Sequence, residues 1–209
     1  MERNITITLE KAREWYNSDN ESLKEVALQA FSEDELIYTF RDITTFKKAC
    51  EVLNIHYEVT SIIKKDIAMV SKASAAMFKL NIIRKALNLG QDLHLTKDPK
   101  GSYICHPFNP ITTEFATYSF KAKGGEIIGK VKIEGKIYEI YGNLSLSSTL
   151  MGIGDFESEK VGYAYASNGF LSCASKEIAQ HFSKYFGILI TEAKYGDMID
   201  FEIIENKYQ

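Results

Sequence analysis

Glycine and proline are distributed very unevenly along this chain of 209 residues. Residues 1–100 contain one of the 13 glycines, Gly90, and one of the three prolines, Pro99. Because glycine is unfavourable inside helices and useful in tight turns, this distribution predicts a helical N-terminal half and a strand-and-turn C-terminal half. We therefore expect an α+β fold: a helical part over 1–95, a junction over 96–110, and an antiparallel β-meander with one long helix over 111–209. The junction is short enough for both parts to share one compact domain.

Side chains that can cap a helix precede several amphipathic segments of the first half. Such a residue accepts a hydrogen bond from a backbone N–H of the first turn. With the segments that they begin, the capping residues are Thr8 (helix through Tyr16), Ser18 or Ser22 (through Ala30), Ser32 (through about Phe40) and Thr45 (residues 46–53). Three of these serines are followed by a glutamate at the spacing of a capping box.

A longer helix is predicted over residues 66–89, with Gly90 ending it. Its apolar residues recur in steps of four and three, which places them on one face of a helix. They are Met69, Ala73, Ala76, Leu80, Ile83 and Leu87. Lys72 and Lys79 border this stripe, where we expect their stems to cover apolar surface while the ammonium groups stay in water.

In the second half the apolar period shortens to two, which is typical of strands. Strands are predicted over 115–122, 126–134, 136–141, 162–166, 170–173 and 198–204. Gly124-Gly125 and Glu134-Gly135 supply turns, so we expect an antiparallel meander. Ser175 is expected to cap an amphipathic helix over 176–194, which Gly196 ends.

Nothing in the sequence indicates export or membrane insertion. Charged residues follow the N-terminus too closely for a signal peptide, and no uncharged stretch reaches the length of a membrane helix. The three cysteines, Cys50, Cys105 and Cys173, are widely spaced, so a disulfide framework is not expected. We therefore expect a cytoplasmic protein that does not enter a membrane.

Two groups of cysteine and histidine residues are candidates for chemistry. Cys173 lies just before a predicted helix, whose N-terminus favours the thiolate, and His181 follows about two turns later on that helix. These two are the candidates for a small cysteine-dependent enzyme, although catalytic pairs usually come from separate elements. Cys105, His106 and His94 lack the paired spacing of a zinc site. The sequence also lacks a cofactor motif, so no metal and no cofactor is expected.

Charge is locally uneven, although the whole chain carries a net charge of only −3. Residues 1–40 have a net charge of −5 and residues 41–100 a net charge of +5. Lys47, Lys48, Lys64 and Lys65 contribute much of this excess. A basic helical segment is typical of a nucleic-acid-binding surface, so binding through these lysines is one hypothesis. Packing of the acidic helices against the basic ones would explain the same pattern.

Two windows of the second half, 140–154 and 161–175, contain no charged residue. Interface cores are depleted in charge and enriched in Tyr and Phe, so Tyr163, Tyr165 and Phe170 are candidate interface residues. If residues 161–173 form an edge strand, it could extend a sheet between two copies of the chain. Central strands of a single core would have the same composition, so both interpretations stay open.

Four blocks of the sequence carry a resemblance to other proteins: residues 8–18 with 23–24, 27–28 and 35–36, residues 45–50 with Leu53, residues 79–80 with 86–88, and residues 174–179. They resemble a group of uncharacterised proteins that are common in gut Bacteroidetes and in their phages and mobile elements. The resemblance implies a phage or mobile-element context and no catalytic residue. We therefore expect a non-enzymatic protein-interaction or structural accessory factor, in the host cytoplasm or in a phage particle. Its partner would be a protein, which can be a second copy of the chain, and the nucleic-acid and enzyme hypotheses are the alternatives.

Overall fold

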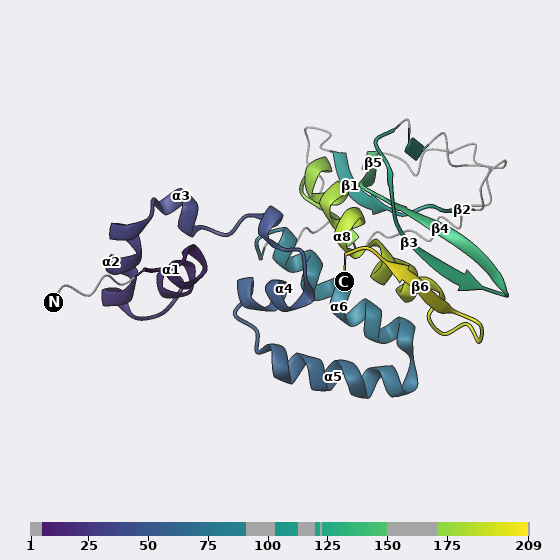
Figure 1. Ribbon diagram of the computed structural model, residues 1–209, viewed down its shortest axis with the longest axis horizontal. Coiled ribbons are helices and arrows are strands. Elements are labelled where there is room, and N and C mark those ends of the chain that lie inside the picture. The colour runs from purple at the N-terminus through teal and green to yellow at the C-terminus, as the bar shows by residue number, and fades with distance from the viewer. Residues whose placement is uncertain (1–5, 91–102, 113–119, 122, 150–170, 209) are drawn as a thin grey trace. The chain divides into compact units, whose positions relative to one another are not determined.

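A computed structural model describes residues 6–90, 103–112, 120–121, 123–149 and 171–208 (Figure 1). Its helices and antiparallel strands confirm the predicted α+β fold. By its internal contacts the chain divides into two units, Met1–Asp42 and Ile43–Gln209. The second unit contains helices as well as strands. The predicted junction over 96–110 includes residues outside the described ranges and stays a prediction.

The first unit is a cluster of short helices. They are α1 (Leu9–Tyr16), α2 (Glu21–Ala30), α3 (Glu33–Leu36) and the 3₁₀ turn η1 (Phe40–Asp42). Ala12, Ala27 and Leu36 are fully buried where these helices meet, and Trp15 packs against them. The core is small, and two of its three central residues are alanines, which lets short helices approach one another closely.

Helix caps in the first unit agree with the sequence at two of three positions. The Thr8 side chain caps α1, and Ser32 forms the predicted capping box with Glu35. Neither serine that was predicted to cap α2 does so, because Asn20 occupies that position and its side chain accepts a hydrogen bond from the first turn. The third helix ends at Leu36 and is therefore shorter than predicted.

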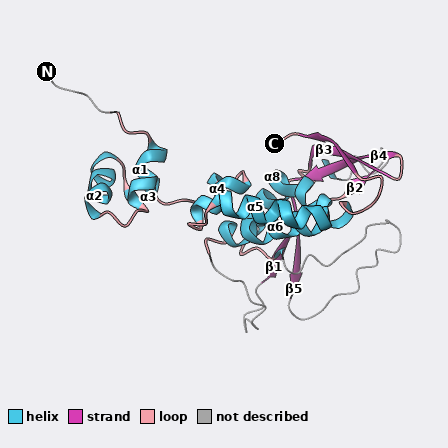
Figure 2. Cartoon of the chain, turned by 90° about the horizontal axis from the view of Figure 1, so that it is seen from below, coloured by secondary structure: helices cyan, strands magenta, loops and turns pink. Residues whose placement is uncertain are grey.

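The second unit combines helices with two antiparallel sheets (Figure 2). Its helices are α4 (Phe46–Val52), α5 (Tyr57–Val70), α6 (Lys72–Leu87) and α8 (Lys176–Tyr195). Its strands are β1 (Tyr103–Phe108), β2 (Ile111–Thr112), β3 (Glu126–Ile133), β4 (Lys136–Gly142), β5 (Leu144–Thr149) and β6 (Glu202–Asn206). One sheet has the order β2-β4-β3-β6, and the other pairs β1 with β5. Helix α8 packs against α6 and against strands of both sheets.

The single long helix predicted over 66–89 is wrong, because the chain breaks at Ser71 into α5 and α6. Ser71 has an extended backbone conformation, and its hydroxyl accepts a hydrogen bond from the N–H of Ser74 (2.9 Å). The same hydroxyl donates to the Asp197 carboxylate (2.6 Å), which lies just after α8. Asp197 also accepts from the N–H of Ala73 (3.2 Å). A distant carboxylate therefore stabilises this break, and the local pattern could not indicate it.

The predicted hairpin is present as β3 and β4. Glu134 and Gly135 form its turn with φ angles of 50° and 75°, a conformation that favours glycine at the second position. The predicted alternation fails at the start of β3, where the register with β4 shifts between Ile127 and Gly129. This bulge adds one residue to β3, so Ile128 is buried together with Val131 and not on the opposite face.

The remaining strand predictions have mixed outcomes. Residues 162–166 and most of 115–122 lie outside the described residues. Of 170–173, Cys173 forms one isolated bridge with Cys105. The last strand covers Glu202–Asn206 and pairs with β3. The sequence pattern did not predict β1 and β5, although β5 lies in the first uncharged window.

Close approach of α8 to the strands depends on Gly187. A methyl group at this position would overlap the amide of Asn109 and the side chain of Ile128. The Asn109 amide donates hydrogen bonds to the carbonyl groups of Tyr141 in β4 (2.8 Å) and Ser183 in α8 (2.9 Å). One half-buried amide thus joins the helix to the sheet at the point where glycine leaves room for it.

We predict that Gly187→Ala strongly destabilises the protein. Inside an ordinary helix this substitution stabilises by up to about 1 kcal/mol, because alanine is the better helix former. Here the overlap with Asn109 reverses the sign, and we expect a loss of about 2 kcal/mol or more in the free energy of unfolding. Urea denaturation measures this, with Gln180→Ala on the same helix as the control of small effect. A Gly187→Ala protein as stable as the natural one would contradict the packing.

Candidate ligand-binding pocket

The structure buries Cys173, the candidate nucleophile. Its side chain is 1% exposed, and its thiol donates a hydrogen bond to the carbonyl group of Leu171 (3.4 Å). Burial and then the neighbouring Cys105 raise the pKa of Cys173 to about 12. A nucleophilic cysteine requires the opposite shift, because the thiolate is the reactive form. The expected effect of the following helix is therefore outweighed by desolvation.

His181, the other catalytic candidate, is held by different partners. Its Nε2 atom lies 2.8 Å from the carbonyl oxygen of Ile43, and its ring packs on Tyr185 with centroids 4.5 Å apart. The Cys173 thiol is directed to Leu171. The geometry therefore does not place the histidine as a base for this thiol.

Metal-ligating side chains do not gather in the part of the chain that the structure describes. Within those residues, no three His, Cys, Asp or Glu side chains lie close enough to hold a metal ion. Cys105 is buried and pairs through its backbone with Cys173, while His94 lies outside the described ranges. The candidate interface residues Tyr163, Tyr165 and Phe170 also lie outside them.

The four candidate lysines separate into two pairs. Lys47 and Lys64 line one pocket of the second unit. Lys48 instead forms an ion pair with Glu51 on its own helix (3.1 Å), and Lys65 is exposed on α5. Two of the four lysines predicted from the basic segment therefore belong to the pocket, and two do not.

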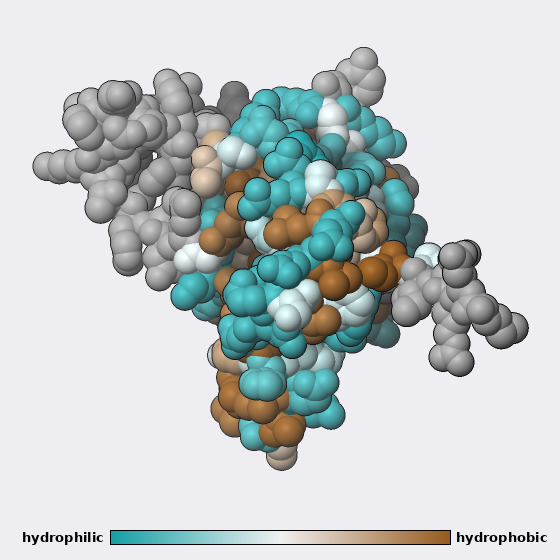
Figure 3. Space-filling view, turned by 90° about the vertical axis from the view of Figure 1, so that its left-hand side faces the viewer, coloured by the Kyte–Doolittle hydropathy of each residue, from teal (hydrophilic) through white to brown (hydrophobic). Residues whose placement is uncertain are grey.

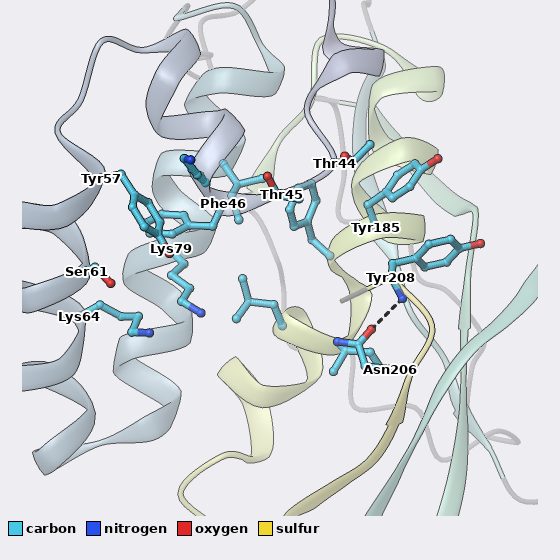
Figure 4. Close-up of a pocket in the computed structure, with 15 residues that line it drawn as sticks. Thr44, Thr45, Phe46, Tyr57, Ser61, Lys64, Lys79, Tyr185, Asn206 and Tyr208 are labelled. Carbon is cyan, nitrogen blue, oxygen red and sulfur yellow. Dashed lines mark hydrogen bonds between the residues drawn. The ribbon is translucent and has the colours of Figure 1, made fainter.

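This pocket has a volume of about 250 Å³ and is formed by five separate parts of the second unit (Figure 4). The segment that begins α4 contributes one edge, α5 and α6 a second, and α8 with β6 and the C-terminal residues the opposite one. Its lining residues are Thr44, Thr45, Phe46, Lys47, Tyr57, Ser61, Lys64, Lys79, Ile83, Tyr185, Phe186, Ile188, Leu189, Asn206 and Tyr208. Figure 4 shows Lys64 and Lys79 extending side by side into the pocket from the helices opposite Asn206.

Lys79 is the least solvated of the three pocket lysines. It lies on α6, where its ammonium group is 5.8 Å from the ring centre of Phe46. Burial lowers the pKa of Lys79, and the positive charge of Lys64 lowers it further, while Glu192 opposes both effects. The expectation of a wet ammonium group is therefore wrong for this lysine, since its charge is held in partly dehydrated surroundings.

The carboxylate of Glu192 partly compensates the positive charge of Lys79. Burial raises the pKa of Glu192, an effect that the charges of Lys79, Lys72 and Lys64 partly offset. Within the described residues, no carboxylate forms an ion pair with Lys79, Lys64 or Lys47 at 4.0 Å or less. The pocket therefore has excess positive potential that an entering anion would neutralise.

Aromatic residues line the pocket beside Lys64 and Lys79 and at its opposite edge. Phe46 and Tyr57 are adjacent, with ring centres 6.0 Å apart, and Tyr185 and Tyr208 are 5.0 Å apart on the opposite side. The Tyr208 hydroxyl donates a hydrogen bond to the Glu126 carboxylate (2.9 Å), which holds this ring in place. All four aromatic residues are half-buried, and Figure 4 shows the rings of Tyr185 and Tyr208 directed away from Lys64 and Lys79.

Sequence reasoning found Lys47 and Lys64 but missed the rest of the pocket. Lys79 has the spacing of an ordinary helix-flanking lysine, which gave no sign of its burial. Tyr185 and Tyr208 are far from α4 in sequence, so the local pattern could not join them to it. The excess positive charge of residues 41–100 was the one useful signal.

Comparisons with known protein families, with curated proteins and with solved structures give no match to this chain. Among the described residues, no helix has both the length and the apolar character that a membrane-spanning helix needs.

We predict that Cys173 is unreactive in the folded protein. At pH 8 its thiol, with a pKa of about 12, is almost entirely protonated and enclosed. Iodoacetamide should modify Cys173 in the folded protein at least about a hundredfold more slowly than it modifies Cys173 in the protein unfolded by urea. Mass spectrometry of the peptide that contains Cys173 measures both rates. Rapid and selective alkylation of native Cys173 would instead support the cysteine-dependent enzyme.

Proposed function

We propose that this protein is a non-enzymatic binding factor whose pocket binds a single-stranded nucleic acid. The observation that carries the proposal is the convergence of Lys47, Lys64 and Lys79 on one pocket bordered by aromatic rings. The proposal retains the role of an accessory factor of a phage or mobile element. It puts the protein in the host cytoplasm or in an assembled phage particle, as the resemblance implies.

The lysines support an anionic ligand. Burial disfavours the charged form of Lys79, and a phosphate group within reach of Lys64 and Lys79 would stabilise that charged form again. The hydroxyl groups of Thr44, Thr45 and Ser61 lie around the same space and can donate to phosphate oxygens. Such contacts fix a backbone without reading its sequence, so we expect little sequence preference.

The aromatic rings favour a single strand over a duplex. Bases in a single strand expose their faces, and stacking on Tyr or Phe contributes about 1–3 kcal/mol per base. Phe46 and Tyr57 offer such rings beside the lysines, whereas the rings of Tyr185 and Tyr208 contact the ammonium group of Lys184, at 5.6 and 5.5 Å. A volume of about 250 Å³ is near the lower limit of ligand pockets, so it suits one nucleotide of a strand and not a double helix.

The cysteine-dependent enzyme receives no support from the geometry. Its candidate nucleophile is buried, with the pKa of Cys173 raised to about 12, and His181 is engaged with Ile43. Binding without chemistry is therefore the simpler role for this fold. The overall net charge of −3 makes the interaction local, because long-range attraction of a polyanion is weak.

Neighbouring lysines on α5 provide a matched test. Lys64 lines the pocket and Lys65 does not, so Lys64→Gln should weaken binding of a labelled ten-nucleotide single strand about tenfold. Lys65→Gln should change the affinity less than about twofold. Fluorescence anisotropy at low salt measures both. With three lysines in contact, the logarithm of the affinity should fall with the logarithm of salt concentration with a slope of about −2.

Lys79→Met is the second variant, because it keeps the apolar stem and removes the charge. Since burial disfavours the charged form of Lys79, this variant should unfold at the same or a higher temperature while binding at least about tenfold more weakly. Equal losses for Lys64→Gln and Lys65→Gln, or none for either, would contradict the pocket as the binding site. Binding of inorganic phosphate without any binding of the strand would point to a small anion as the ligand.

A further inference from the structure

The outward face of α5 is apolar although nothing in the described second unit covers it. Val59, Ile62, Ile63, Met69 and Val70 are exposed to 54%, 61%, 43%, 86% and 90%. Their spacing places them on one stripe of the helix. Figure 3 shows apolar side chains gathered at the lower end of the second unit, where Figure 1 has α5.

The opposite face of the same helix is already in use. Thr60 is buried there beside Cys50, and Ser61 and Lys64 line the pocket. Helix α5 packs on α6 through this inner side. A helix whose free side is apolar is typical of an interaction surface, because a contiguous exposed patch of large aliphatic residues is unfavourable in water.

Charges beside the stripe indicate what covers it. Glu58 and Lys65 lie two helical turns apart on the same flank of the stripe, and both are exposed. Among the described residues neither forms an ion pair. When two copies of a helix pack antiparallel about a two-fold axis, the same flank of each faces the other. The two-fold relation then sets Glu58 opposite the partner's Lys65, and Lys65 opposite the partner's Glu58.

Asp66 fits the same arrangement. It is the one charged residue within the stripe, where it separates Ile62 from Met69. In the register that joins Glu58 to Lys65 of the partner subunit, it lies next to the first turn of the partner's α5. A carboxylate is favourable at a helix N-terminus, because the partial charge there is positive.

We propose that two copies of the chain associate through this face, with residues 59–63 of α5 packed antiparallel on the same residues of the second copy about a two-fold axis, while Met69 and Val70 lie against the chain that precedes the second copy's α5. The pocket lies on the other side of each helix, so a dimer presents two pockets and neither site obstructs the other. A stripe of this size on one helix is near the low end of specific interfaces, so we expect a dissociation constant in the micromolar range, about 10–100 µM.

Sedimentation equilibrium between 1 and 300 µM tests the proposal on the full chain. The natural protein should pass from monomer to dimer over this range, and Ile62→Lys should remain monomeric. Ile137→Lys is the matched control, since Ile137 lies on β4 and is exposed to 57%, close to the 61% of Ile62. It should dimerise like the natural protein.

Charge reversal tests the antiparallel register itself. Glu58→Lys alone and Lys65→Glu alone each set like charges against one another at two symmetric positions, and each should weaken the dimer about fivefold. The double variant with both reversals restores the opposite-charge contacts and should recover the natural affinity. A natural protein that stays monomeric at 300 µM, a dimer unaffected by Ile62→Lys, or a double variant no tighter than the single ones would each overturn the proposal.

Discussion

Helix α8 can lie against the strands of the second unit because residue 187 has no side chain. Gly187 leaves space for the Asn109 amide, which bonds to the helix and to β4 at once. The other side of α8 packs on α6, and its C-terminal end supplies Asp197, which holds the break between α5 and α6 at Ser71. The packing of α8 therefore determines where α5 lies relative to it, and with that the pocket between the two helices.

Partial burial of the Lys79 ammonium group in the pocket costs free energy. Lys79 is partly buried beside another lysine, and both factors lower its pKa. Glu192 offsets this charge in part, because its carboxylate opposes the lowering of the Lys79 pKa while burial raises the pKa of Glu192 itself. Groups kept in such unfavourable surroundings are frequent at binding sites, where the ligand supplies the missing interaction. A phosphate group would do so here, and the nearby rings would then select the kind of molecule that carries it.

Local signals in the sequence predicted local structure well and distant contacts poorly. Thr8, Thr45 and Ser175 cap their helices as predicted, because a cap depends on residues within one turn. The break at Ser71 was missed because its partner, Asp197, comes 126 residues later. The pocket was only partly predicted for the same reason. Two of its lysines belong to a basic segment of the sequence. Its tyrosines and the burial of Lys79 depend on the packing of α8 and the C-terminal residues near α4, α5 and α6.

The pKa of Lys79, measured by NMR of its side-chain carbon and nitrogen atoms, tests the account most directly. In the unliganded protein we expect a pKa below the ordinary lysine value of about 10.4, because the ammonium group is desolvated and lies near Lys64. Adding a ten-nucleotide single strand should raise this pKa, since a nearby phosphate favours the charged form. An ordinary pKa that the strand does not change would contradict the claim that Lys79 is held for an anionic ligand.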